Sequence, residues 1–218
     1  MKPVYRLTWI AARAYYALWH RWRALHPERV PVHGPVILAA KHASYLDPPL
    51  IGSGLPRAIN YLARESLFRF PGFGAYLRAL NCVPVDRDGA GAAGLKGILD
   101  RLHAGGAVIL FPEGTRIARG QVGEYKTGGT RLSVETGVPV VPIATTSARC
   151  WPRKSFLLRP GVVDISIGRQ IRPEGREPGE LMTEVKTWIE SEMRRLDPEA
   201  YQDASPAAVA GQPAPHRR

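Results

Sequence analysis

The chain has 218 residues, of which 44% are hydrophobic, so we expect one sizeable core and exclude an intrinsically disordered protein. Lys and Arg number 30 against 19 Asp and Glu, which gives a formal net charge of +11. This excess of positive charge favours an anionic partner: nucleic acid, a phosphorylated metabolite or an acidic membrane surface.

The N-terminal segment is basic and rich in aromatic residues. Residues 1–41 contain seven Lys or Arg and one acidic residue, Glu28. Residues 4–25 are predicted to form a helix that ends before Pro27 and contains three of the five tryptophans. Tyr and Trp suit the headgroup level of a membrane and arginines meet anionic lipid, so we expect this helix to lie on a membrane surface. A helix packed on the core, with solvated arginines, is the alternative.

The same segment is not expected to cross a membrane. No apolar run approaches the ~18–20 residues that a bilayer requires, and Arg13 interrupts the best candidate. The sequence also shows no apolar stretch followed by a small-residue cleavage site, as a secretory signal would. We therefore expect a cytoplasmic protein with Cys82 and Cys150 as reduced thiols, since two cysteines make neither a disulfide framework nor a zinc site.

From Pro35 onwards, short apolar strands alternate with helical stretches. The strands are expected at 36–40, 83–85, 107–111, 138–143 and 162–167, and the helices around Leu50 and Ile51, near 92–103 and at 127–136. Short strands with helices between them predict an α/β fold whose sheet is buried on both faces.

The C-terminal part reads as a helix followed by a tail. Glu180–Leu196 is predicted to be helical and to stop before Pro198, and the residues that follow are small, Pro-rich and aperiodic. We therefore expect three regions: an N-terminal interfacial helix at 1–27, the main domain at 28–197 and a disordered tail at 198–218.

His42 and Asp47 follow the first predicted strand and are five positions apart. At this spacing one helical turn allows a carboxylate to hold an imidazole in its basic tautomer. Ser44 is expected to cap the helix that begins here. Such pairs also arise by chance, and a solvated loop histidine is the alternative, so the motif depends on its neighbours for its meaning.

Phe111–Arg116 reads Phe-Pro-Glu-Gly-Thr-Arg and directly follows another predicted strand. Gly114 permits an unusual backbone angle, and Arg116 can then grip a phosphate with its guanidinium. Arg87 follows a third strand in the same way. An ordinary polar turn is the alternative explanation for Phe111–Arg116, and a surface ion pair with Asp86 is the alternative for Arg87. Because chemistry gathers at the carboxyl ends of strands in such sheets, we expect one shared site.

Three other function classes have less support in the sequence. Gly89–Gly94 fits the dinucleotide pattern G-x-G-x-x-G, but Asp86 and Asp88 separate it from the strand and would repel a pyrophosphate. A nucleic-acid-binding protein that uses residues 1–41 would leave His42 unexplained. The sequence contains neither the G-x-S-x-G elbow of a serine hydrolase nor a Walker loop.

Together these blocks resemble the glycerolipid acyltransferase family, specifically the 1-acyl-sn-glycerol-3-phosphate (lysophosphatidate) acyltransferases. The resemblance covers about residues 35–171. It is carried by His42–Asp47, by the block that ends in Arg87, by Phe111–Arg116, by Lys126-Thr127-Gly128 and by Val-Pro-Val-Val-Pro-Ile at 138–143. It implies an α/β fold with a mixed, mostly parallel sheet flanked by helices, and an N-terminal amphipathic helix at the membrane interface.

The resemblance also implies roles for individual residues. His42 would be the general base that takes the proton from the hydroxyl of the acceptor as that oxygen attacks an acyl thioester, and Asp47 would orient it, with no acyl-enzyme. The acceptor phosphate would be held by a larger set: Arg64, Arg87, Glu113, Gly114, Thr115, Arg116 and Lys126.

By the same resemblance, the substrates would be a lysophospholipid acceptor and a donor that is acyl-CoA or acyl carrier protein. No cofactor, metal or nucleic acid is implied, and the enzyme would lie on the cytoplasmic face of an anionic membrane as a peripheral or monotopic protein. Three departures leave the acceptor open, so that another lysophospholipid or a lyso-ornithine lipid is the alternative: Lys41 in place of the usual Asn, Asn81 in place of a Gly, and Arg64 in place of a Lys.

Overall fold

A computed structural model describes residues 2–85, 92–152 and 157–202. The helices are α1 (Pro3–Trp19), α2 (Asp47–Gly54), α3 (Pro71–Ala79), α4 (Ala92–His103), α5 (Gly128–Thr136), α6 (Pro178–Leu196) and α7 (Pro198–Tyr201). The strands are β1 (His20–Leu25), β2 (Val36–Ala40), β3 (Ile59–Arg64), β4 (Cys82–Val85), β5 (Ala107–Leu110), β6 (Val140–Thr145) and β7 (Gly161–Ile167). Short 3-10 helices include η2 (Glu65–Arg69) and η3 (Ser147–Arg149).

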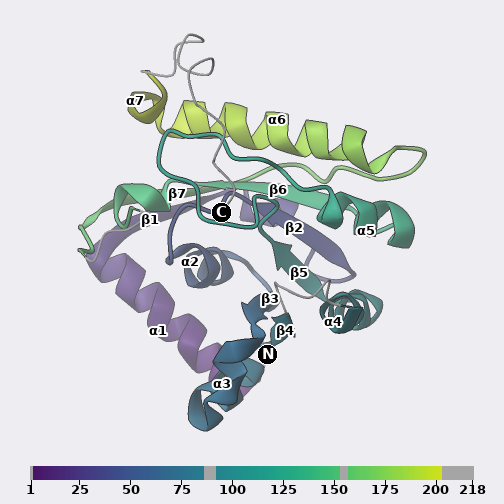
Figure 1. The fold of residues 1–218 in the computed structure, drawn as a ribbon. Helices are drawn as coiled ribbons and strands as arrows, with labels where there is room; N and C mark the ends of the chain where they lie inside the picture. Colours follow the sequence, from purple (N-terminus) through teal and green to yellow (C-terminus); the bar gives the residue numbers. More distant parts are fainter. Residues whose placement is uncertain (1, 86–91, 153–156, 203–218) are drawn as a thin grey trace, which may run out of the picture.

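One sheet of seven strands runs through the molecule in the order β1-β7-β6-β2-β5-β3-β4. Neighbouring strands are parallel except for β6 and β7, which are antiparallel. Helices α5 and α6 cover one face, and α1 and α2 cover the other (Figure 1). The predicted fold class, a mixed and mostly parallel sheet flanked by helices, is confirmed.

The central strand β2 shows why the sheet needs two covers. Val36, Leu38 and Ala40 belong to the cluster of buried residues on the side of α1 and α2. Ile37 and Ala39 belong to the cluster on the side of α4, α5 and α6. Side chains alternate between the faces of a strand, so an uninterrupted apolar run buries both faces at once.

The prediction of one helix over residues 4–25 is wrong at its C-terminal end. Helix α1 ends at Trp19, and the next six residues form β1, which pairs in parallel with β7 at the edge of the sheet. Within β1, Arg21 and Arg23 point outwards while His20 is buried. This alternation with a period of two is typical of a strand. The strand follows the helix directly, without a turn residue that would mark the end of the helix in the sequence.

Two further elements were not predicted, and the tail begins later than expected. β3 and α3 lie in the stretch 59–79, for which the sequence pattern gave no element. α6 is confirmed, but residues 198–201 form α7 and are not a disordered tail, because Tyr201 is buried against the α6 side of the sheet. The rest of the predicted tail, 203–218, lies outside the described residues.

The arrangement of the strands brings three distant segments to one edge. β5, β2 and β6 are neighbours in the sheet and run in parallel. The segments that follow their carboxyl ends begin at Phe111, Lys41 and Thr146. These segments therefore form a common surface at this edge.

Within the described ranges, no helix is both long and apolar enough to cross a membrane.

Candidate active site

The turn between β2 and α2 is organised around the carboxylate of Asp47. Asp47 is fully buried at the first position of α2. Its Oδ2 atom lies 2.9 Å from Nδ1 of His42 and accepts hydrogen bonds from the backbone N–H groups of Ala43 and Ser44, both at 2.8 Å. One carboxylate oxygen thus fixes both the imidazole and the backbone that carries it. The structure brings His42 and Asp47 together as the spacing predicts.

Ser44 has a different role from the one predicted. The first turn of α2 has no side-chain cap, and the hydroxyl of Ser44 accepts a hydrogen bond from the N–H group of Leu46, which precedes the helix. The negative charge of Asp47 at the N-terminus of α2 instead complements the helix dipole. The prediction that Ser44 caps the helix is therefore wrong.

The imidazole of His42 is held on one side and open on the other. Its ring stacks on Phe111 with 4.1 Å between the ring centres, and 15% of the side chain is exposed. The carbonyl of His42 accepts a hydrogen bond from the N–H group of Ile117 at 2.8 Å. In the described part of the chain Nε2 makes no hydrogen bond, so this nitrogen is available to a substrate.

Glu113 lies behind the imidazole, where it does not face the open site. Its Oε2 accepts a hydrogen bond from the backbone N–H of His42 at 2.8 Å, and its Oε1 lies 2.8 Å from Nζ of Lys41. The Lys41 ammonium is fully buried and also lies 2.7 Å from Glu190 of α6, which accepts a hydrogen bond from Tyr125. Burial raises the pKa of Glu113, and the Lys41 ammonium opposes that rise. Glu113 thus supports the backbone of the histidine.

Two of the predicted cations lie against segments that border His42. The guanidinium carbon of Arg116 lies 3.5 Å from the centre of the Tyr45 ring. Tyr45 is three residues after His42 in the chain. Nζ of Lys126 lies 3.5 Å from the point that a Cβ atom on Gly114 would occupy. Gly114 has a φ of +65°, a backbone angle that favours glycine.

Other predicted phosphate ligands are less closely tied to this group. Arg64 is exposed at the carboxyl end of β3, which is separated from β2 by β5. Thr115 is exposed beside Arg116. Arg87 and the glycine run that begins at Gly89 fall on residues 86–91, which lie outside the described residues.

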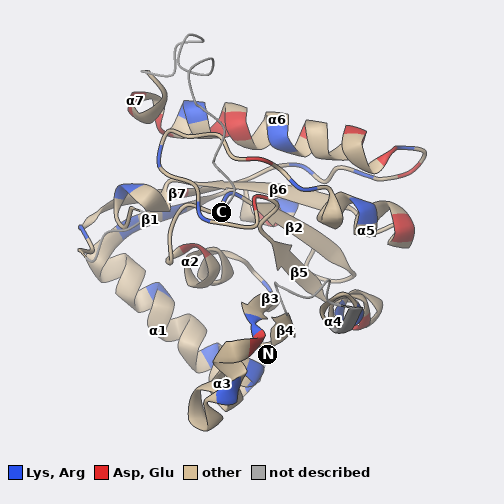
Figure 2. Cartoon of the chain, in the orientation of Figure 1, with Lys and Arg blue, Asp and Glu red and all other residues tan. Residues whose placement is uncertain are grey.

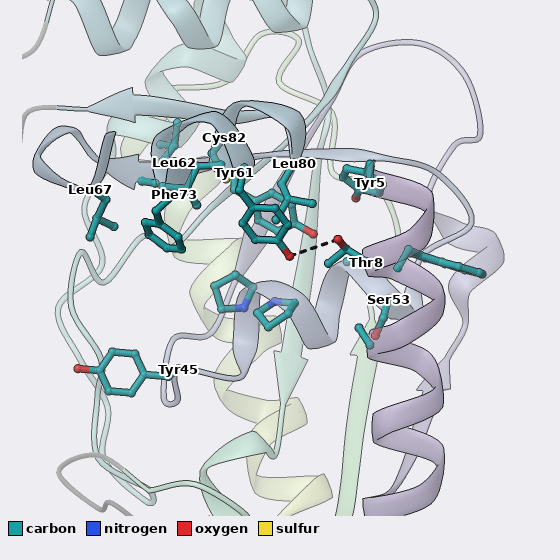
Figure 3. A pocket seen from close by; sticks show the side chains of 18 residues that line it. Tyr5, Thr8, Tyr45, Ser53, Tyr61, Leu62, Leu67, Phe73, Leu80 and Cys82 are labelled. Atoms are coloured by element: carbon teal, nitrogen blue, oxygen red, sulfur yellow. Dashed lines mark hydrogen bonds between the residues drawn. The ribbon is translucent and has the colours of Figure 1, made fainter. Parts of the chain in front are cut away.

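A pocket of about 490 Å³ opens beside the turn that carries the dyad (Figure 3). Its lining comes from α1, α2, β3 and α3 and is largely apolar, and Tyr45, Pro48 and Pro49 bring the segment around Asp47 to its wall. Two of the lining residues, Thr8 and Tyr76, share a hydrogen bond of 3.2 Å. Such a pocket suits a hydrocarbon chain. The sequence pattern does not predict this pocket, because it indicates neither β3 nor α3.

The segment after β6 contributes two residues that the sequence analysis missed. The hydroxyl of Ser147 donates a hydrogen bond to Oδ1 of Asp47. The ring of Trp151 lies 5.4 Å from that of Tyr45. One signal could have revealed this segment: it follows the carboxyl end of a strand, the same rule that was applied to His42 and Arg116.

Comparison with known proteins adds independent findings. A sequence model of the acyltransferase family matches residues 22–146. The 1-acyl-sn-glycerol-3-phosphate acyltransferase of Pseudomonas aeruginosa is 32% identical over 178 residues, which cover 78% of this chain and 68% of that protein. The Bacillus subtilis protein of the same name is 29% identical, and the match covers 56% of this chain and 61% of that protein.

A solved structure is similar as well. The crystal structure of the 1-acyl-sn-glycerophosphate (LPA) acyltransferase PlsC from Thermotoga maritima superimposes with a TM-score of 0.78 at 27% sequence identity. The superposition covers 88% of this chain and 79% of that chain. The chain is therefore similar to these acyltransferases both in sequence and in fold.

Proposed function

The chain belongs to the acyltransferase family, and we propose that it moves a fatty acyl group from a thioester to the free sn-2 hydroxyl of 1-acyl-sn-glycerol-3-phosphate, giving phosphatidic acid. The protein is therefore an enzyme. The observation that carries the proposal is the imidazole of His42, which is held through Nδ1 by Asp47. Tyr45, three residues further on, contacts Arg116 and lines an apolar pocket.

In the proposed reaction His42 acts as general base. Nε2 takes the proton of the acceptor hydroxyl while that oxygen attacks the carbonyl carbon of the thioester. The carbon–sulfur bond then breaks, and the leaving thiolate receives the proton from the imidazolium. Asp47 keeps the proton of the neutral ring on Nδ1 and stabilises the imidazolium that forms. The attacking oxygen belongs to the substrate, so the protein needs no nucleophile of its own.

Arg116 and Lys126 are proposed to hold the acceptor phosphate. Arg116 offers a planar fork to the phosphate oxygens, and Lys126 adds a point charge beside the Gly114 turn. Arg64, which is exposed at the carboxyl end of β3, would add a further positive charge. Binding the phosphate places the hydroxyl within reach of His42 and removes part of the entropic barrier.

The apolar pocket is proposed to bind a fatty acyl chain. Its wall includes Tyr45 and Pro48, which flank Asp47 in the chain, so a hydrocarbon chain in the pocket would begin close to the dyad. Gly52 lies on this wall, and a Cβ atom there would lie 1.8 Å from the hydroxyl of Tyr61. Burial of the methylene groups of the acyl chain would supply binding energy that a thioester with a short acyl group lacks. The donor is acyl-CoA or acyl carrier protein, since both present the same thioester.

We further propose that the enzyme binds the cytoplasmic face of a membrane as a peripheral protein. Large apolar side chains are exposed on α1 and on the neighbouring η2–α3 segment: Leu7, Ile10, Leu18, Trp19, Phe70 and Phe73. Arg6 and Arg13 lie on α1, and Arg78 lies on α3, so positive charge is present on both helices (Figure 2). Apolar insertion combined with attraction to anionic lipid holds a helix on a surface.

The test is an assay of the purified protein with labelled donors. Lysophosphatidate, other lysophospholipids and a lyso-ornithine lipid are each offered with acyl-CoA and with acyl carrier protein. We expect phosphatidic acid as the main product. His42→Ala should lose a factor of about 100 or more in kcat, the share that a general base supplies. His33→Ala, at an exposed histidine, is the matched control.

Two results would count against the proposal. His42→Ala with wild-type activity would remove the base from the mechanism. Loss of activity in the double variant Cys82→Ala/Cys150→Ala would indicate a covalent thiol intermediate in its place. Preference for another lysolipid would keep the mechanism and change the acceptor.

A further inference from the structure

Ser147 joins the dyad from a part of the chain that is remote in sequence. It is the first residue of η3, directly beyond the carboxyl end of β6, and it is fully buried. Its hydroxyl donates a hydrogen bond to Oδ1 of Asp47, 100 residues earlier in the chain. Because β6 and β2 are neighbours in the sheet, the contact follows from the strand order.

The two oxygens of Asp47 have different partners. Oδ2 accepts from the imidazole of His42 and from two backbone N–H groups. Within the described residues Oδ1 accepts from Ser147 alone. A buried carboxylate oxygen without a donor is costly, so the hydroxyl of Ser147 satisfies an acceptor atom that no solvent reaches.

The donor is held in place by its own backbone. The carbonyl of Ser147 accepts hydrogen bonds from the N–H groups of Cys150 and Trp151, each at 3.0 Å. The preceding residue, Thr146, donates its N–H to the carbonyl of Asp164 at 3.0 Å. The hydroxyl is therefore presented to Asp47 from a turn that is tied to both β6 and β7.

We propose that Ser147 is a positioning residue of the active site, which acts through Asp47 to set the orientation and the basicity of the His42 imidazole. The proposal rests on the proposed function, in which His42 is the base. Donation to Oδ1 compensates part of the negative charge of the carboxylate. Without it, that charge acts more strongly on the imidazolium, so the ring keeps its proton to a higher pH.

Other ionisable groups also face the dyad, and removal of the hydroxyl leaves them in place. Tyr16 of α1 interacts electrostatically with Asp47. Glu113, paired with Lys41, holds the backbone of His42 from the side of β5. Arg116 lies over the ring of Tyr45. In the described structure none of these side chains forms a hydrogen bond with Ser147, so Ser147→Ala changes one contact of the dyad.

The experiment compares Ser147→Ala with a matched control, Ser133→Ala. Ser133 is also fully buried, but it donates to the carbonyl of Val138, away from the dyad. The pKa of His42 is measured by NMR titration of the histidine ring signals, and His42→Asn assigns the signal. The pH dependence of kcat/KM is measured with lysophosphatidate as acceptor.

For Ser147→Ala we expect the His42 pKa and the acidic limb of the pH profile to rise together by about 0.5–1 pH unit. The reason is that part of the energy of the lost hydrogen bond to the charged Asp47 is transmitted to the imidazole. We expect kcat to fall roughly tenfold, as is typical when a supporting partner of a reactive group is lost. Ser147→Cys, with a weak S–H donor, should lie between wild type and Ala, and it carries the comparison if the Ala variant does not fold.

A Ser147→Ala protein with the wild-type pKa of His42 and the wild-type acidic limb overturns the proposal, as does an equal shift in Ser133→Ala. Failure of the proposed function would look different. His42→Asn would then remain active, while the NMR titration would still show whether Ser147 acts on the ring.

Discussion

At the scale of single residues, Tyr45 connects the two halves of the site. One face of its ring carries the guanidinium of Arg116, and the ring of Trp151 lies next to it at an interplanar angle of 48°. The same side chain lines the apolar pocket and is 59% exposed. Stacking fixes the plane of the guanidinium and leaves its N–H groups free for a phosphate. Tyr45 therefore stands between the proposed phosphate and acyl sites.

This placement predicts that the ring of Tyr45 matters and its hydroxyl does not. Tyr45→Leu should raise the KM for lysophosphatidate by about two- to fivefold, the value of an exposed cation–π contact, with little change in kcat. Tyr45→Phe keeps the stack and should resemble wild type. Steady-state kinetics with varied acceptor give both values. Equal behaviour of the Leu and Phe variants would contradict a stacking role.

The part of the site that the sequence could predict is the local part. His42 and Asp47 are five residues apart in the short segment that joins β2 to α2, so a contact between them needs no knowledge of the strand order. Ser147 is 100 residues from its partner, and only the neighbouring positions of β2 and β6 bring the two together. Lys41 departs from the family pattern, which the sequence shows. Its ion pair with Glu190 could not be predicted, because Glu190 lies in α6, far along the chain.

At the scale of elements, α1 has one anchored and one unpartnered side. Tyr5 and Tyr16 are buried, while Leu7 is 70% and Leu18 is 89% exposed. The helix contacts α2 and α3 but leaves these leucines without a cover in the described structure. A membrane surface is the proposed cover, and the exposed side chains of η2 and α3 lie next to it.

We therefore predict that Leu7→Asp/Leu18→Asp weakens binding to anionic vesicles by about tenfold or more, since each buried leucine is worth roughly 1.5–3 kcal/mol. The fold should survive, because both side chains are largely exposed. Co-sedimentation with phosphatidylglycerol vesicles measures the change. Leu95→Asp, at an exposed leucine of α4, is the control, and equal binding of all variants would contradict the proposal.

The sequence pattern predicted the strands with long apolar runs and missed β1 and β3. β2 is apolar throughout because both of its faces are covered, and its predicted and observed bounds agree. β1 carries two outward arginines and continues directly from a helix of similar composition. β3 ends in Arg64 and has only two fully buried positions, so its apolar pattern is weak.

At the scale of the whole molecule, Asp197 ties the C-terminus to the segments that border the site. It is buried and accepts two hydrogen bonds from Arg119 and one from Arg149. Arg119 lies in the loop after Phe111–Arg116, and Arg149 lies in η3. Burial would raise the pKa of Asp197, but the two arginines outweigh burial and lower it.

Asp197→Asn should reduce the free energy of unfolding at pH 7 by roughly 2–3 kcal/mol, since a charged network loses its acceptor. A lowered pKa contributes stability above the unfolded value near pH 4, and this stability is lost as the pH falls through the folded value. The difference between variant and wild type should therefore shrink below about pH 4. Urea unfolding at several pH values measures it. Glu199→Gln, at an exposed carboxylate 3.9 Å from Arg119, is the control and should change little.

The edge position of β1 has a consequence for solubility. Six residues of β1 pair with β7, whose last five residues are all buried. A chain shortened to begin at residue 20 would lose the helix and keep this cover. A chain shortened to begin at residue 28 would expose a long apolar edge with unpaired backbone groups, which is a template for pairing between molecules. The N-terminal segment thus protects the protein from aggregation as well as carrying the proposed membrane surface.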